Sequence, residues 1–216
     1  MAIPHDFGLY GILTDPEVGY ERLAQLMVER ELAFVQLRMK GCSRDEVWEM
    51  ARRLRRIVVS PSRLIINDEP EIAAEVEADG VHLGQDDMPY AEARRIVGPD
   101  AIIGLSTHNP DQTRAACALG PDYIGVGPVF PTPTKRVADP AIGLQGMKAM
   151  LSAATVPAVV LGSVDHDNAA ELLAAGASNL CAVRSINRVD DPGAALDRFQ
   201  AILTLYRRSG QTVGPL

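Results

Sequence analysis

The residues best suited to chemistry alternate along one short segment, "VQLRMK" (35–40). Its polar residues are Gln36, Arg38 and Lys40, and the residues between them are apolar. Successive side chains of a β-strand point to opposite faces, so these three polar side chains share one face. Two cations on the enclosed face of a sheet need an anion, because burying an unpaired charge is costly. The segment therefore predicts a site for an anionic ligand, with a salt bridge that fills the sheet interior as the alternative.

Carboxylates follow two other apolar runs. The segment "LIIND" ends in Asn67 and Asp68, and "HLGQDD" ends in Asp86 and Asp87. Adjacent strands lie about 5 Å apart, so one carboxylate from each segment can reach the same cation. Mg²⁺ is bound in this way, through one or two carboxylates with water and substrate phosphates. The residues alone leave open which of Asp86 and Asp87 takes part, and whether Asp68 or Asp86 only caps the following helix.

A loop with hydroxyls and a cation follows the apolar run 123–130. It reads "PTPTKR" and contains Thr132, Thr134 and Lys135. Proline cannot donate to a sheet, so the chain is expected to leave the sheet near Pro131. Hydroxyls and a lysine on a proline-stiffened loop suit a phosphate, although this stretch alone does not decide the ligand.

Two later apolar runs end in groups that can bind a second anion. "VLGS" ends in Gly162 and Ser163, and "AVRS" contains Val183 and Arg184. In parallel barrels the loops after the seventh and eighth strands often form a phosphate site. Gly162 permits close approach of the backbone, and Arg184 offers a bidentate donor.

Ser106 and His108, which follow the fifth apolar run, are further candidates for proton chemistry. Ser106 ends the run "IIGLS", and His82 lies inside the run "GVHLG". No third member of a nucleophilic triad lies near these two residues in the sequence. We expect His82 to be a hydrogen-bonded core histidine rather than a ligand contact.

Apolar runs alternate with amphipathic segments along the whole chain. The expected strands are 9–15, 34–39, 63–68, 80–84, 101–107, 123–130, 158–163 and 179–185. The expected helices are 20–31, 43–59, 70–78, 88–98, 109–120, 143–155, 165–176 and 191–208. Helix starts are indicated by Ser43 with Glu46, Asn109–Pro110 and Asp191–Pro192, and helix ends by Gly98, Gly120 and Gly176.

Eight strand–helix units without a break in composition predict a single (β/α)₈ TIM barrel domain over residues 1–216. A flexible tail is expected from about residue 209. The alternative, an open doubly wound sheet, favours fewer units and a glycine-rich turn after its first strand, where this chain has "LTDPEVGY". In a barrel the chemistry belongs at the carboxyl ends of the strands, where all the candidate residues above are expected.

The composition indicates which kinds of partner the protein is expected to bind. The net charge of −7 argues against a nucleic-acid-binding face. Three widely spaced cysteines predict free thiols, and neither a signal peptide nor an apolar run of about 20 residues is visible. We expect a cytoplasmic protein that binds small molecules, without nucleic acid or membrane partners. The oligomeric state, a homo-oligomer included, stays open.

Four segments together resemble the thiamine-phosphate synthase family. They are "VQLRMK", "LIINDEPEIAAEVEADGVHLGQDD", "IIGLSTHN" and "YIGVGPVFPTPTK", and they occur in the family's order along nearly the whole chain. The resemblance implies a transferase with a (β/α)₈ fold. Such an enzyme joins a pyrimidine pyrophosphate to a thiazole phosphate by a dissociative substitution and releases pyrophosphate, with Mg²⁺ as cofactor.

The resemblance also implies roles for individual residues. It assigns the pyrimidine pyrophosphate to Gln36, Arg38, Lys40, Asn67, Ser106 and Lys135. It assigns Mg²⁺ to Asp68 and Asp87, and the thiazole phosphate to Thr132, Thr134, Gly162, Ser163, Val183 and Arg184. The residues expected to act in catalysis are Arg38, Lys40, Ser106 and Lys135.

Two residues depart from the family pattern, which usually has a second glycine at Ser163 and a serine at Arg184. A positive φ at Ser163 would cost about 1–2 kcal/mol. Two other functions stay open: a thiazole tautomerase, whose relatives typically carry a histidine at Pro128, and a non-catalytic phosphate-binding barrel. The pair Asp68 and Asp87, with Lys135, favours the synthase.

Overall fold

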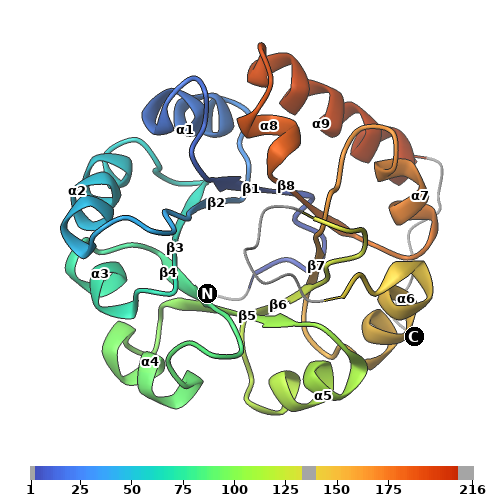
Figure 1. Ribbon diagram of the computed structural model, residues 1–216, viewed down its shortest axis with the longest axis horizontal. Helices are drawn as coiled ribbons and strands as arrows, with labels where there is room; N and C mark the ends of the chain where they lie inside the picture. Colours follow the sequence, from blue (N-terminus) through green and yellow to red (C-terminus); the bar gives the residue numbers. More distant parts are fainter. Residues whose placement is uncertain (1–2, 133–139, 209–216) are drawn as a thin grey trace.

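The computed structural model describes residues 3–132 and 140–208 of the chain. Eight parallel strands pair in sequence order, and β8 pairs with β1 to close a barrel. A ring of helices surrounds this barrel (Figure 1). The predicted (β/α)₈ TIM barrel is therefore confirmed. The tail expected to be flexible from about residue 209 lies outside the described residues.

The elements follow the expected order. The strands are β1 (Leu9–Leu13), β2 (Phe34–Leu37), β3 (Arg63–Asn67), β4 (Gly80–Leu83), β5 (Ile102–Thr107), β6 (Tyr123–Val126), β7 (Ala158–Val160) and β8 (Asn179–Ala182). The helices are α1 (Tyr20–Glu29), α2 (Arg44–Arg55), α3 (Pro70–Glu75), α4 (Tyr90–Val97), α5 (Pro110–Ala118), α6 (Gly143–Ala153), α7 (Ala169–Ala174), α8 (Arg184–Asn187) and α9 (Pro192–Arg208). Among the described helices, none is long and apolar enough to cross a membrane.

The local signals at the helix ends are confirmed. Ser43 and Glu46 form a capping box at the start of α2. The side chain of Asn109 accepts a hydrogen bond from the backbone N–H of Gln112 at 2.9 Å, and Asp191 accepts from Ala194 at 2.9 Å. Such caps satisfy backbone donors that have no partner within the helix.

Seven of the eight strands end one to four residues earlier than the apolar runs suggest, and β6 and β8 show two causes. β6 ends at Val126, although the run continues to Phe130, because Pro128 cannot donate to the ladder. β8 ends at Ala182, and Arg184 opens the short helix α8, which the sequence did not predict. The buried Asn187 of α8 fixes this helix to β1, since its side chain donates to the carbonyl of Ile12 at 2.7 Å.

The lower half of the barrel interior is aromatic. Tyr10, Phe34 and Tyr123 point inward from three strands, and Phe7 packs edge-on against Phe34 with ring centroids 4.8 Å apart. The buried side chain of Asn179 holds the segment that carries Phe7, accepting from the backbone N–H groups of Phe7 and Gly8 at 2.7 and 2.8 Å. This packed layer fills the barrel interior below the cavity that opens at the carboxyl ends of the strands.

Candidate active site

A cavity of about 1430 Å³ opens at the carboxyl ends of the strands. Its lining includes most of the candidate residues, namely Gln36, Arg38, Lys40, Asn67, Asp68, Asp87, Ser106, Val183 and Arg184. Thr134 and Lys135 lie outside the described residues. The predicted location of the chemistry, at the mouth of the barrel, is the place where the chain gathers these side chains.

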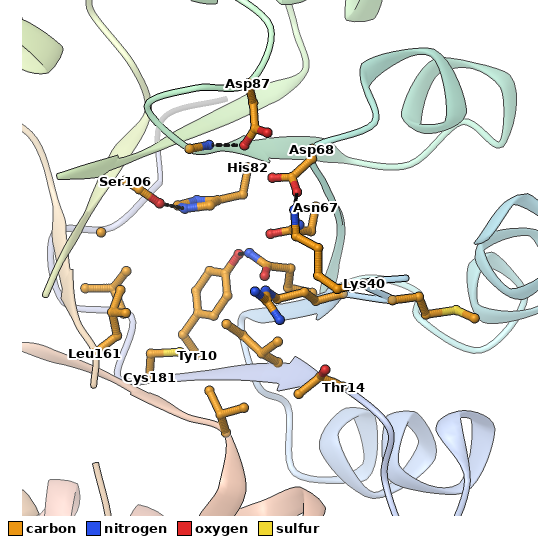
Figure 2. A pocket seen from close by; sticks show the side chains of 18 of the residues that line it. Tyr10, Thr14, Lys40, Asn67, Asp68, His82, Asp87, Ser106, Leu161 and Cys181 are labelled. Atoms are coloured by element: carbon orange, nitrogen blue, oxygen red, sulfur yellow. Dashed lines mark hydrogen bonds and ion pairs between the residues drawn. The ribbon is translucent and has the colours of Figure 1, made fainter. Parts of the chain in front are cut away.

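The polar residues of β2 and of the segment after it differ in how deeply they are buried in the cavity. Gln36 is buried and its Nε2 donates to the hydroxyl of Tyr10 at 3.0 Å. Arg38 is half-buried, and burial lowers the pKa of its guanidinium while the nearby Asp68 carboxylate opposes the shift. Lys40 is largely exposed and forms an ion pair with Asp68 (Figure 2). Since this pair lies at the open mouth, it is not a salt bridge that fills the barrel interior.

Asp68 does not serve as a helix cap. The residue before α3 is Glu69, which makes no side-chain capping bond, and the residue before α4 is Pro89. Asp68 itself adopts a left-handed backbone with φ of 65°. A non-glycine residue in that region stores about 1 kcal/mol or more of strain, which is typical of functional positions.

The structure brings Asp87, rather than Asp86, towards Asp68. Asp86 is exposed, whereas Asp87 is half-buried and its Oδ2 accepts a hydrogen bond from the N–H of Gly84 at 2.7 Å. Burial, and then the neighbouring Asp68 carboxyl group, raise the pKa of Asp87. Figure 2 shows both carboxyl groups on the same side of the cavity. Two acids this close repel one another when both are ionised.

The turn after β7 is built around Gly162. Its φ is 110°, and a Cβ atom there would lie 2.6 Å from both Pro128 Cα and the backbone N of Val129. Glycine is therefore required for the approach of this turn to the segment after β6. The close approach that the sequence suggested involves protein backbone.

Ser163 has a φ of 49°, so the backbone strain expected of a serine at this position is present. Its hydroxyl donates to the carbonyl of Pro131 at 2.6 Å. This bond brings the segment with Thr132 to the Gly162–Ser163 turn. On the other side, Val183 and the exposed Arg184 line the cavity where β8 gives way to α8.

The chain matches the family model described as thiamine monophosphate synthase over residues 9–186. It belongs to the thiamine monophosphate synthase family. It is 37% identical over 212 residues to the thiamine-phosphate synthase of Chloroflexus aurantiacus, covering 95% of this chain and 97% of that one. It is also 39% identical over 185 residues to the thiamine-phosphate synthase of a Synechocystis species, covering 85% of this chain and 54% of that longer protein.

A solved structure supports the same family. The thiamine phosphate pyrophosphorylase from Pyrococcus furiosus superposes with a TM-score of 0.83 and 28% sequence identity. The match covers 93% of this chain and 96% of that one. Thiamine monophosphate synthases are enzymes, so the cavity at the barrel mouth is the candidate active site.

The acidic pair fits the Mg²⁺ that the thiamine monophosphate synthase resemblance implies. Burial and the neighbouring Asp68 carboxyl group raise the pKa of Asp87, and a divalent cation at this pair would favour the ionised form of both carboxyl groups. Among the described residues no group of three or more His, Cys, Asp or Glu side chains could hold a metal. A site of two carboxylates completed by water and phosphate oxygens is ordinary for Mg²⁺.

The sequence did not predict the polar network beneath this site. Ser106 Oγ lies 2.9 Å from Nε2 of His82, whose Nδ1 lies 3.0 Å from the hydroxyl of Tyr123. His82 is thus a hydrogen-bonded core histidine, as expected, but it also lines the cavity. The two-residue period of "GVHLG", which places His82 on the face opposite Val81 and Leu83, was the available signal.

Proposed function

We propose that the chain is a thiamine-phosphate synthase. It joins 4-amino-2-methyl-5-(diphosphooxymethyl)pyrimidine to a thiazole phosphate, giving thiamine phosphate and pyrophosphate. The bond between the pyrimidine's exocyclic methylene and the pyrophosphate oxygen breaks, and the thiazole nitrogen lone pair forms the new bond to that methylene. The observation that carries the proposal is one cavity that is lined by Arg38, Lys40, Asp68 and Asp87 and also by Val183 and Arg184, where β8 meets α8.

The first wall binds the pyrimidine pyrophosphate. Arg38, Lys40 and Asn67 face the cavity and would hold the pyrophosphate oxygens, with Gln36 and Ser106 beside the pyrimidine ring. Mg²⁺ bound at Asp68 and Asp87 would add positive charge against the leaving pyrophosphate. Lys135 belongs to the same group in this proposal.

The second wall binds the thiazole phosphate. It comprises Thr132, Thr134, the Gly162–Ser163 turn, Val183 and Arg184. The hydrogen bond from Ser163 to the carbonyl of Pro131 supports this grouping, because it joins the turn to the loop that carries the two threonines. Since Lys135 follows Thr134, this loop would bridge the two reactants.

The chemistry needs no covalent nucleophile. The thiol of Cys181 lies in the cavity, but burial raises its pKa to about 12, so it stays protonated. Ser106 is hydrogen-bonded to His82, but the group on the far side of His82 is the hydroxyl of Tyr123 and not the carboxylate of a Ser-His-Asp triad. A dissociative path, in which the aminopyrimidine stabilises a developing cation, asks the enzyme mainly to orient reactants and to offset charge.

The proposal also places the enzyme in the cytoplasm. Its reactants are small molecules, and all three cysteines are free thiols, which suits the reducing cytoplasm. The cationic side chains of the cavity explain how a protein of net charge −7 can bind two anionic reactants.

A pyrophosphate-release assay tests the function. The purified protein is given both reactants and Mg²⁺, with reactions that lack either reactant as controls. Pyrophosphate and thiamine phosphate should appear only when both reactants are present. A tautomerase would release no pyrophosphate, and a non-catalytic binder would leave both reactants unchanged, so either result would refute the proposal.

A further inference from the structure

A chain of hydrogen bonds crosses the barrel at the floor of the cavity. From Ser106 it passes to His82 at 2.9 Å and on to the hydroxyl of Tyr123 at 3.0 Å. From there it runs to the hydroxyl of Tyr10 at 2.7 Å and ends at Nε2 of Gln36 at 3.0 Å. Figure 2 shows Ser106 and His82 pointing toward one another on one side and Tyr10 in the middle of the side chains drawn. Both end residues line the cavity, and the middle three have no role in the function proposed above.

The surrounding residues are arranged around this chain. Tyr10 and Tyr123 are 1% and 0% exposed, and Gln36 is 2% exposed. Gly104 of β5 leaves the space for the central bond, because a Cβ atom there would lie 2.1 Å from Tyr123 Cζ and 2.6 Å from His82 Nδ1. Buried polar groups that are fully bonded to one another hold a single arrangement.

The donors and acceptors of these five side chains fix which group donates in each hydrogen bond of the row. The amide nitrogen of Gln36 can only donate, so it donates to Tyr10. Burial raises the pKa of both phenols, so each keeps its one proton. Tyr10 then donates to Tyr123, and Tyr123 donates to Nδ1 of His82. A neutral His82 that accepts at Nδ1 carries its proton on Nε2 and donates it to Ser106.

We infer that Tyr10, Tyr123 and His82 are positioning residues that set the hydrogen-bonding direction at both ends of the pyrimidine site. Because Ser106 accepts from His82, its own hydroxyl proton is directed to the ligand. Because the Gln36 amide nitrogen is engaged below, its carbonyl oxygen faces the ligand as an acceptor. The inference rests on the proposed function, since it assigns the pyrimidine to these two side chains.

This donor and acceptor pair selects the amino form of the ring. An aminopyrimidine offers a ring nitrogen that accepts and an exocyclic amine that donates. The corresponding oxo-pyrimidine offers a ring N–H and a carbonyl, which is the opposite pattern. Sites built to hydrogen-bond a substrate group discriminate strongly against an analogue that leaves the site's polar groups unpaired.

The tautomer of His82 tests the inferred direction of the hydrogen bonds, and it can be measured without an enzyme assay. The chain has four histidines, so ¹⁵N-histidine labelling gives few imidazole signals, and the His82→Gln variant identifies those of His82. The expected result is a neutral ring protonated at Nε2. A ring protonated at Nδ1, or at both nitrogens, would overturn the inferred direction whether or not the protein is a synthase.

Substrate selectivity tests the positioning role. The ratio of kcat/KM for the amino and the oxo pyrimidine pyrophosphates should be roughly 100 or more in the unaltered protein. Tyr123→Phe should lower this ratio about tenfold or more and leave the KM for the thiazole phosphate unchanged.

Phe34→Leu is the matched control for this variant. Phe34 packs against both phenols, with ring centroids 5.5 and 5.7 Å away, but takes no part in the chain of hydrogen bonds. The Phe34→Leu variant should keep the ratio of kcat/KM values that the unaltered protein shows for the amino and oxo pyrimidines. An unchanged ratio in Tyr123→Phe, or an equal loss in both variants, would overturn the positioning role. An unaltered protein that turns over neither pyrimidine contradicts the synthase proposal instead, and the imidazole measurement then decides the inference.

Discussion

At the scale of single residues, the site combines groups that would be unfavourable anywhere else. Asp68 holds a left-handed backbone, Asp87 has a raised pKa beside it, and Arg38 is a half-buried cation. Strain and like charges persist where binding of a ligand relieves them. The raised pKa and half-buried position distinguish Asp87, the proposed metal ligand, from the exposed Asp86.

The pair of aspartates gives the first prediction. Asp87→Asn should reduce pyrophosphate release by roughly 100-fold or more, because the charge that offsets the leaving group is lost. The melting temperature should not fall, since the variant removes a carboxylate that burial and Asp68 disfavour. Asp86→Asn is the control, because Asp86 is exposed and should leave activity unchanged. Equal activities in the two variants would remove Asp87 from the proposed metal site.

Arg184 gives the second prediction. It is exposed, lines the cavity and stands where the family usually has serine. A charge-assisted bond to the thiazole phosphate contributes about 1.5–3 kcal/mol. Arg184→Ser should therefore raise the KM for the thiazole phosphate about tenfold, with little change for the pyrimidine substrate.

Arg188 provides the comparison for that variant. It also lines the cavity and is exposed, but its guanidinium is paired with Asp15. Arg188→Ser should change the KM for the thiazole phosphate less than Arg184→Ser does. If Arg184→Ser leaves this KM unchanged, the phosphate is bound by the backbone of the Gly162–Ser163 turn and Arg184 has no role in it.

At the scale of elements, the turn after β7 depends on the segment after β6. Gly162 combines a φ of 110° with contact to the backbone of Pro128 and Val129. Gly98, which ends α4, has a φ of 84° and no atom within 4 Å of the place of a Cβ. Both glycines have a positive φ, and they differ in the space around them.

This difference predicts unequal losses of stability. Gly98→Ala should lower the free energy of unfolding by about 1–2 kcal/mol, the cost of a left-handed non-glycine residue. Gly162→Ala should cost at least about 2 kcal/mol more, because backbone must also move. Urea denaturation of both variants measures this, and equal losses would mean that the turn relaxes without disturbing β6.

The strands and most helices could be predicted because apolar runs, caps and glycines are local signals. Ser43 with Glu46, and Asn109 before Pro110, marked helix starts correctly. The end of β6 was missed although Pro128 is a local signal, whereas the helix α8 could not be predicted because it depends on a contact with a distant segment. Asn187, for example, bonds to β1 across 175 positions of the chain.

The candidate site was predictable to a similar degree. The two-residue period placed Gln36 and Arg38 on the inner face, and the strand order placed Asp68 near the following acids. Spacing could not separate Asp86 from Asp87, since their side-chain directions are set by the turn at Gly84. The hydrogen bonds among Tyr10, Tyr123 and His82 join three different strands, so no regular spacing in the sequence predicts them.

At the scale of the whole molecule, Asn179 helps to close the barrel where its last strand, β8, meets its first strand, β1. Its amide accepts from Phe7 and Gly8 and donates to the carbonyls of His5 and Ala158 at 2.9 and 3.0 Å. One fully buried side chain thus satisfies four backbone groups at the point where β8 meets β1.

Asn179→Ala should lower the free energy of unfolding by about 3 kcal/mol or more, because buried backbone groups lose their partners at about 1–3 kcal/mol each. Asn109→Ala, which removes only a helix cap, should cost about 1 kcal/mol. Denaturant unfolding compares the two. A loss at Asn179 no larger than that at Asn109 would show that this residue does not hold the closure of the barrel.

The division of the cavity between two reactants is tested most directly by one crystal structure, that of the protein with Mg²⁺, pyrophosphate and thiamine phosphate. Pyrophosphate should contact Arg38 and Lys40, with the metal between it and the carboxylates of Asp68 and Asp87. The phosphate of thiamine phosphate should lie at the Gly162–Ser163 turn. A metal bound away from both aspartates, or the two anions in exchanged positions, would contradict the proposed site.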